Sequence, residues 1–173
     1  MPDIILDTNL LADFLAQFFG SARRGRDLFT TQGAISRELA RKINYIVIWH
    51  NWNLESKESI AQHPGWIGAA TFAFVEIAHK WTDIVRERFT VEQMAGFVEH
   101  PPAWFVIEPI DENLVDPFFD APTDALTARG ETRSSEWPDT IQVAVAFGRG
   151  DACLLAVTDQ EVRRIDVLKN RLV

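Results

Sequence analysis

The sequence predicts an α/β fold in which helices cover a mainly parallel sheet. Three observations support this prediction. Short apolar runs, of which Ile4–Leu6 and Cys153–Val157 are the clearest, have the length of buried strands. Longer stretches between them repeat apolar residues every three or four positions, as helices packed on one side do. Strands that alternate with helices in this way are typical of parallel sheets, because each helix carries the chain back to the start of the next strand.

Length and composition fit a single domain over 1–173. The chain is 47% hydrophobic and 24% charged, and its one cysteine, Cys153, excludes an internal disulfide and fits a reducing compartment. No apolar run approaches the roughly 18 residues that a membrane span needs. Asp3 and Asp7 stand where a signal peptide would carry basic residues. We therefore expect a cytoplasmic protein with no membrane partner.

The net charge of −8 argues against broad nonspecific binding to nucleic acid. The acidity is uneven, because 111–137 holds seven acidic residues and two arginines. Cationic patches elsewhere on the surface are compatible with this distribution.

A helix is predicted directly after the first strand. Its apolar residues recur at spacings of three and four and are Leu10, Leu11, Phe14, Leu15, Phe18 and Phe19. The next stretch, 20–26, contains two glycines and three arginines and is predicted to be a turn. Its arginines are interpreted as solvated, with phosphate contact as the alternative.

A second helix is predicted over 34–49, and aromatic residues follow its polar face. The buried side is expected to carry Ile35, Leu39, Ile43, Ile46 and Val47, opposite Arg37, Glu38, Arg41 and Lys42. The aromatics Tyr45, Trp49 and Trp52 are interpreted first as core residues. Base stacking beside the basic residues and a partner-binding groove are the alternatives.

The middle of the chain predicts two more strands with helices between them. The strands are 66–70 and 104–107, and Thr71 is expected to cap a helix over 72–83. Thr90 and Gln93 have the spacing of a capping box at the start of another helix, and Pro101-Pro102 ends it.

The acidic segment 111–137 is a long connection, and the segment 20–65 is also predicted to be inserted or extended. Directly after 111–137, Pro138 suits the first turn of a helix that Gly148 ends. The strand 153–157, a short helix over 160–165 and a last strand or tail over 167–173 complete the prediction.

Four acids are predicted to meet at one edge of the sheet. Asp7 and Asp159 directly follow strands, whereas Asp139 opens a helix and Glu76 lies early in another. In a right-handed α/β fold, the starts of such helices lie over the carboxyl ends of the strands, where ligands bind. Four converging carboxylates repel one another unless a hard cation such as Mg²⁺ or Mn²⁺ binds them, which would suit hydrolysis of a phosphodiester. An acid after a strand can instead be only a helix cap, so the position of Asp7 alone leaves both interpretations open.

The same residues carry a resemblance to a known family. Ile5–Asn9, Thr71–Glu76, Asp139–Ala146 and Leu155–Asp159 resemble the conserved segments of PIN domains, in their order, from the N-terminus to about Ile165. The most specific parts are the opening Asp-Thr-Asn and the closing Thr-Asp. The Glu76 match is less specific, since it is one acid in a loosely defined helix.

The resemblance implies a three-layer α/β/α fold with strand order 3-2-1-4-5 and β-strand 4–6 at its centre. It also implies a Mg²⁺- or Mn²⁺-dependent ribonuclease, in many prokaryotic relatives the toxin of a VapBC-type toxin–antitoxin pair, and homodimers are common. Asp7, Glu76, Asp139 and Asp159 would be the metal ligands, supported by Asn9 and Thr158. An antitoxin would be expected to place an apolar helix near Trp49 and Trp52.

Other interpretations of the strand-then-Asp pattern fit less well. A phosphatase of the haloacid-dehalogenase kind needs a second Asp two residues on, where this chain has Asn9. A receiver domain needs an acidic pair near the N-terminus and a later strand-end Lys, and neither is evident. The main alternative to catalysis is a PIN-like scaffold that binds protein through its aromatic surface.

Overall fold

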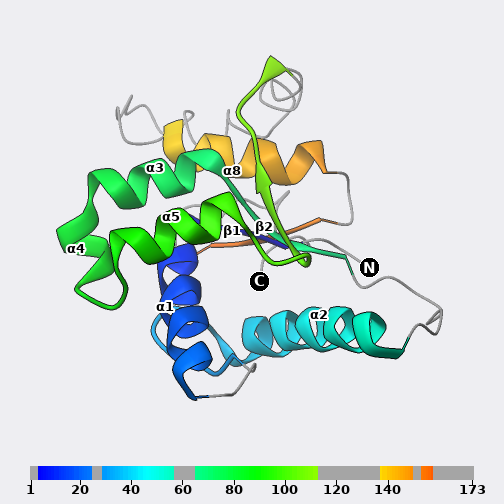
Figure 1. The fold of residues 1–173 in the computed structure, drawn as a ribbon. Coiled ribbons are helices and arrows are strands. Elements are labelled where there is room, and N and C mark those ends of the chain that lie inside the picture. The colour runs from blue at the N-terminus through cyan, green and yellow to red at the C-terminus, as the bar shows by residue number, and fades with distance from the viewer. Residues whose placement is uncertain (1–3, 25–28, 57–64, 113–136, 150–152, 158–173) are drawn as a thin grey trace.

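The computed structural model describes residues 4–24, 29–56, 65–112, 137–149 and 153–157 (Figure 1). Its sheet contains β1 (Ile4–Leu6), β2 (Ile67–Ala70), β3 (Phe105–Glu108) and β4 (Leu154–Ala156) in the order β3-β2-β1-β4. All three neighbouring pairs are parallel, so the prediction of an α/β fold with a parallel sheet is confirmed. The predicted helix over 160–165 and strand over 167–173 lie outside the described residues, and the full order 3-2-1-4-5 stays a prediction.

Strand β1 lies between β2 and β4 and is buried along its whole length. Ile4 pairs with Ile67 on one side and Leu154 on the other. Ile4 and Leu6 face one hydrophobic cluster, and Ile5 faces a second cluster across the sheet. Because successive side chains of a strand point to opposite faces, a strand buried on both faces is uniformly apolar. This explains the run Ile-Ile-Leu.

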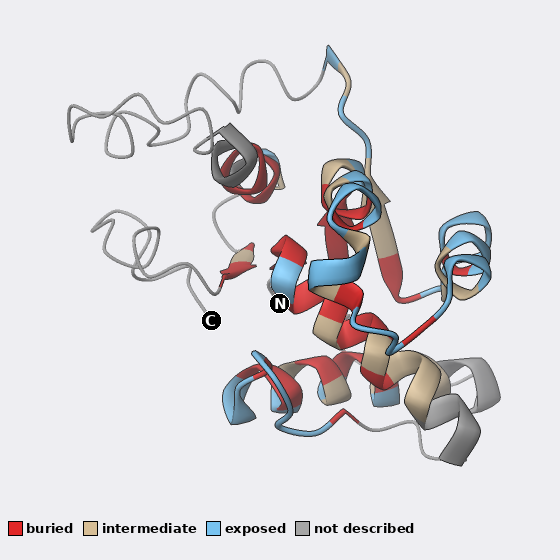
Figure 2. Cartoon of the chain, turned by 90° about the vertical axis from the view of Figure 1, so that its left-hand side faces the viewer, coloured by how far each residue is buried: buried red, intermediate tan, exposed pale blue. Residues whose placement is uncertain are grey.

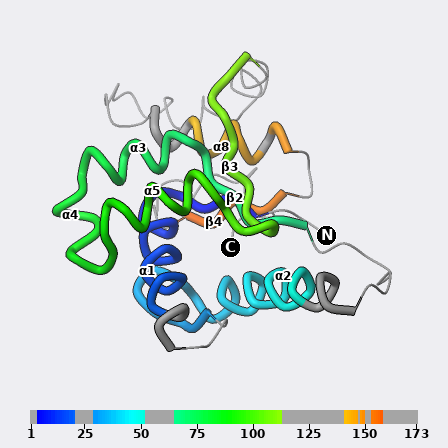
Figure 3. The backbone as a smooth tube through the Cα atoms, viewed as in Figure 1, coloured from blue at the N-terminus to red at the C-terminus, as the bar shows by residue number. Residues whose placement is uncertain are grey.

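Helices pack on both faces of the sheet (Figures 1 and 3). The face of Ile4 carries the larger cluster, to which α1 (Thr8–Arg24), α2 (Arg37–Ser56), α3 (Thr71–His79) and α5 (Val91–Glu99) contribute. The short helix α4 (Trp81–Val85) connects α3 to the turn before α5. The opposite face carries α8 (Trp137–Gly148).

Aromatic rings fill the larger cluster around Phe14 of α1. The Phe14 ring stacks on Phe29 with centroids 4.8 Å apart and on Phe105 of β3 at 5.4 Å. Phe97 of α5 meets the ring of Phe105 edge-on at 4.9 Å. These contacts join α1, α5 and the sheet. Each aromatic pair of this kind stabilises the fold by about 0.5–1.5 kcal/mol beyond the contribution of its buried area.

The smaller cluster depends on the small side chains of α8. Val143, Ala144, Val145 and Ala146 are buried against Ile5 and Leu155. Short side chains let the helix approach the strands closely, as the sequence predicted. No helix in the described part of the chain has the length and apolar character of a membrane span.

Several boundaries differ from the sequence predictions. Helix α1 continues to Arg24 instead of turning at Gly20, and α2 spans Arg37–Ser56 instead of 34–49. A glycine costs a helix only about 1 kcal/mol, which the packed ring cluster of α1 outweighs. The predicted helix over 72–83 is divided into α3 and α4 at Lys80.

Two side-chain predictions are wrong. Thr71 does not cap α3; it is the first helical residue, and its hydroxyl donates to the Glu108 carbonyl of β3 at 2.9 Å. Tyr45 is not a core residue, because half of it is exposed. Trp49 is partly buried, and the side chain of Trp52 lies outside the described part. The capping box of Thr90 and Gln93 is confirmed.

The helices that carry predicted site residues begin at one end of the sheet. Each of α1 and α3 follows its strand directly, so both start where β1 and β2 end. Figure 1 shows α8 running back along the sheet with its first turn on this same side, and Figure 2 views that side directly. Asp7, which directly precedes α1, and the first turn of α8, which contains Asp139, therefore lie at the carboxyl end of the sheet, whereas Glu76 is the sixth residue of α3.

Candidate functional site

Asp7 forms the junction between β1 and α1. Its backbone N–H donates to the Ala156 carbonyl of β4 at 2.9 Å, and its own carbonyl accepts from the Leu11 N–H at 2.8 Å. The carboxylate Oδ1 accepts from the Leu10 N–H at 2.7 Å, so Asp7 caps α1. The residue is only 7% exposed. These bonds fix the carboxylate at the carboxyl edge of an interior strand.

Thr8 connects this junction to α3. Its hydroxyl donates to Oε2 of Glu76 at 2.6 Å, and Thr8 itself is buried. A bond this short to an ionised carboxylate is charge-assisted and stronger than one between neutral groups. The contact joins the first turn of α1 to α3 and orients the Glu76 side chain beside Asp7-Thr8.

Lys80 holds the other oxygen of Glu76. Its Nζ lies 2.7 Å from Oε1, one helical turn further along the chain. The Glu76 side chain is 16% exposed and that of Lys80 is 52% exposed. The cost of partly burying an acid in an apolar helix is therefore offset by an ammonium and a hydroxyl.

The other predicted site residues are described less fully. Asn9 is exposed in the first turn of α1. Asp139 is the third residue of α8, so its backbone lies in that helix's first turn, at the same end of the sheet (Figure 1). Thr158 and Asp159 lie outside the described residues, directly after Val157. Of the predicted site residues, the structure thus connects Glu76 to Thr8, the residue that directly follows Asp7.

The donor set is of the kind that hard cations prefer. Asp7 and Glu76, the two members of the predicted quartet whose side chains are described, both offer carboxylate oxygens. Mg²⁺ and Mn²⁺ prefer oxygen ligands. Within the described ranges, no cluster of three acidic, histidine or cysteine residues is close enough to hold a metal ion. The side chains of the other two members of the predicted quartet, Asp139 and Asp159, lie outside the described part.

Thr8 and Lys80 were not singled out as site residues from the sequence. Lys80 stands four positions after Glu76, and this spacing alone places the two side chains side by side on a helix. Thr8 and Glu76 are 68 positions apart, so no local pattern connects them. Only the position of α3 beside the start of α1 shows their contact.

No protein-family model matches the sequence, and no curated protein matches it.

Proposed function

We propose that this chain is a Mg²⁺- or Mn²⁺-dependent ribonuclease with a PIN-like three-layer fold and strand order 3-2-1-4-5. Asp7, Glu76, Asp139 and Asp159 are its proposed metal ligands, with Asn9 and Thr158 as supporting polar groups. The narrower form of the proposal is that the chain is the toxin of a VapBC-type pair, inhibited by an antitoxin that docks near Trp49 and Trp52.

One observation carries the proposal. A buried carboxylate, Asp7, directly follows an interior parallel strand, and the next residue, Thr8, donates a hydrogen bond to a second acid, Glu76. Ligands of parallel α/β folds bind at this edge. The strand order of the described sheet is compatible with the first four places of the PIN-like order.

The protein groups have separable roles in this proposal. The cap bond from Leu10 fixes one oxygen of Asp7, and the hydroxyl of Thr8 sets the orientation of Glu76. Such outer contacts determine how accurately carboxylates are placed for a cation. When bound, the metal supplies Lewis-acid stabilisation of the phosphodiester oxygens and a more acidic water. The ammonium of Lys80, half exposed beside Glu76, adds positive charge at the same edge.

The proposal is tested by calorimetric titration of metal-stripped protein with Mn²⁺, followed by an RNA cleavage assay. We expect saturable binding that Asp7→Asn and Asp139→Asn weaken at least tenfold, and cleavage that Asp7→Asn abolishes. Asp83→Asn, at an exposed acid of α4, is the matched control and should change neither result. Metal-dependent cleavage that persists in Asp7→Asn protein would contradict the assignment.

A non-catalytic PIN-like scaffold is the second candidate, and a specific observation favours it. Asp7 caps a helix and Glu76 is paired with Lys80, so both carboxylates already have partners within the protein. The scaffold predicts no productive metal binding, and it predicts that Asp139→Asn leaves protein binding intact. Saturable Mn²⁺ binding that depends on Asp7 and Asp139 would exclude it.

A further inference from the structure

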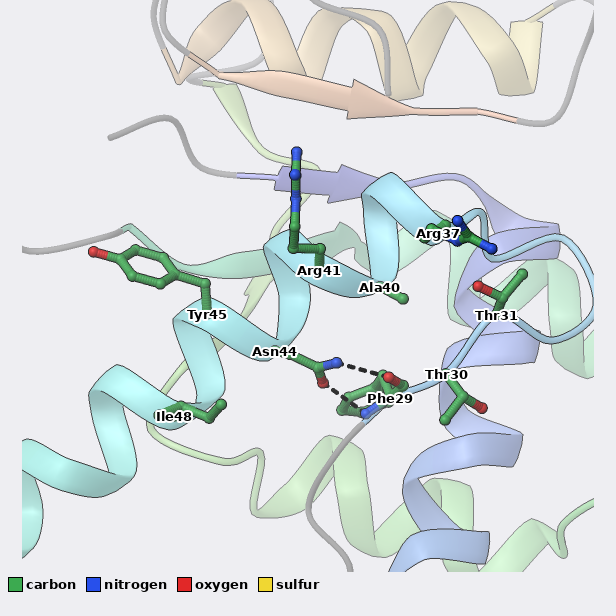
Figure 4. Close-up of a pocket in the computed structure, with 9 residues that line it drawn as sticks. All are labelled: Phe29, Thr30, Thr31, Arg37, Ala40, Arg41, Asn44, Tyr45 and Ile48. Carbon is green, nitrogen blue, oxygen red and sulfur yellow. Dashed lines mark hydrogen bonds between the residues drawn. The ribbon is translucent and has the colours of Figure 1, made fainter.

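A groove on α2 combines positive charge with an exposed aromatic ring. It is a shallow, open depression of about 510 Å³ between the first three turns of α2 and the segment 29–31 (Figure 4). Its lining residues are Phe29, Thr30, Thr31, Arg37, Ala40, Arg41, Asn44, Tyr45 and Ile48. Two of them are cationic and none is acidic, although the whole chain carries a net charge of −8.

The exposed groove residues of α2 form one stripe along the helix. Arg37, Arg41 and Tyr45 recur every four positions, so they share one side of α2 at intervals of about 6 Å. Ile48 continues the stripe after three more positions. Tyr45 is 50% exposed and Ile48 is 48% exposed, so both present apolar surface to the solvent at one end of the stripe.

The acid on this part of α2, Glu38, does not pair with the arginines of the stripe. Glu38 is paired with Lys42 at 3.6 Å, one turn along the helix. Neither Arg37 nor Arg41 has an acidic partner among the described residues, and both are exposed. Figure 4 shows Arg37 beside Thr31 at one end, Tyr45 at the other, and Arg41 extending from the helix between them.

Two amide side chains fix the opposite wall of the groove. Asn44 accepts from the Phe29 N–H at 2.6 Å and donates to the Phe29 carbonyl at 2.7 Å. Gln17 accepts from the Thr30 N–H at 2.9 Å and donates to the Thr30 carbonyl at 2.8 Å. The groove therefore exists before any ligand binds, which lowers the entropic cost of binding.

We propose that this groove binds single-stranded RNA, with a base stacked on Tyr45 against Ile48 and backbone phosphates on Arg37 and Arg41. Two cations followed by an aromatic ring match what unpaired nucleic acid offers, because every base has a flat face and every linkage has a negative charge. A guanidinium group also binds two oxygens of one phosphate at the same time. The inference rests on the proposed function, since it gives the substrate strand a second contact away from the carboxylates.

Binding is measured by fluorescence anisotropy with a labelled oligouridylate in EDTA, where no metal supports cleavage. Tyr45→Ser and the double variant R37Q/R41Q should each weaken binding about tenfold, and Tyr45→Phe, which keeps the ring, should bind like the parent chain. The double variant should also flatten the dependence of log affinity on log salt by about 1.4, or about 0.7 for each lost phosphate contact.

The matched control is K42Q/R86Q, which removes one exposed cation, Arg86, and one that is 33% exposed, Lys42, both outside the groove. Binding that this control weakens as much as R37Q/R41Q does would overturn the proposal, as would the absence of binding. Binding of an acidic peptide in place of the RNA would overturn it as well. Cleavage that depends on Asp7 but not on Tyr45 would contradict only the proposal that the groove binds RNA. RNA binding without cleavage would contradict only the proposed ribonuclease activity.

Discussion

The hydroxyl of Thr8 donates to Oε2 of Glu76 at 2.6 Å and so joins the start of α1 to α3. The contact lies one residue from Asp7, at the carboxyl end of the interior strand β1. It determines where the Glu76 carboxylate lies, while Lys80 determines what charge it meets. Structural and proposed catalytic roles therefore meet in these four residues and can be separated by substitution.

Replacing Thr8 by valine keeps the shape of the side chain and removes the donor. We expect the free energy of unfolding to fall by about 1–2 kcal/mol, because a part-buried carboxylate loses a charge-assisted hydrogen bond. Thr8→Ser should retain most of the stability. Urea denaturation measures the change, with Thr82→Val, at an exposed threonine of α4, as the control. Equal midpoints for Thr8→Val and the parent chain would show that the bond contributes nothing.

Lys80 competes with a cation for Glu76 at the proposed metal site. Lys80→Met removes the ammonium 2.7 Å from Oε1 and should strengthen Mn²⁺ binding about fivefold, the effect of roughly 1 kcal/mol of Coulomb repulsion in a well-solvated site. Stability should fall by no more than about 0.5 kcal/mol, because the lysine is half exposed.

Lys42→Met is the control for this effect, since it breaks a similar pair with Glu38 far from Asp7 in the sequence. Calorimetry should give the same Mn²⁺ affinity for Lys42→Met and the parent chain. Unchanged or weaker Mn²⁺ binding by Lys80→Met would remove Glu76 from the proposed ligand set.

The sequence predicted the elements whose signals are local. Uniformly apolar runs identified β1 and β4, and the spacing of Thr90 and Gln93 identified the start of α5. The exposure of Tyr45 was also readable, since it stands four positions after Arg41 on the polar side of α2. The prediction that Tyr45 is a core residue follows from its aromatic character, whereas the helical spacing from Arg41 places it on the polar side.

Contacts between distant segments were beyond prediction from the sequence. Thr71 has the chemistry of a helix cap, but its hydroxyl finds the Glu108 carbonyl, which the pairing of β2 with β3 brings near. The contact of Thr8 with Glu76 depends in the same way on where α3 packs. For the candidate site, the spacing of Lys80 and Glu76 is local and readable from the sequence, whereas the hydroxyl of Thr8 is not. That all four acids share one edge stays a prediction.

Asn44 holds the segment before α2 in place. Asn44→Ala removes both of its hydrogen bonds to the buried Phe29 and should cost about 1–3 kcal/mol, the usual penalty for unpaired buried polar groups. The exchange of the Phe29 amide hydrogen should accelerate in parallel. Asn51→Ala, in the same helix, is the control and should leave that exchange rate unchanged. Equal protection of the Phe29 amide in Asn44→Ala would contradict the bonding assigned to this residue.

Two glycines should respond to alanine with opposite signs. At Gly68 of β2, a Cβ would lie 2.8 Å from the Val106 carbonyl oxygen of β3 and 3.3 Å from Cδ1 of Ile5. Because Gly68 pairs with Val106, that oxygen cannot retreat without separating the strands, and Gly68→Ala should cost about 1–3 kcal/mol.

Gly96 lies in α5 with nothing within 4 Å of an added Cβ. There, alanine restricts the unfolded chain and adds no clash, so Gly96→Ala should stabilise the protein by about 0.4–1 kcal/mol. Thermal or urea unfolding of both variants measures the change in the free energy of unfolding, and the same substitution, glycine to alanine, is made at both positions. A stabilising Gly68→Ala would mean that β2 and β3 are not paired as described, whereas a destabilising Gly96→Ala would mean that this face of α5 is covered.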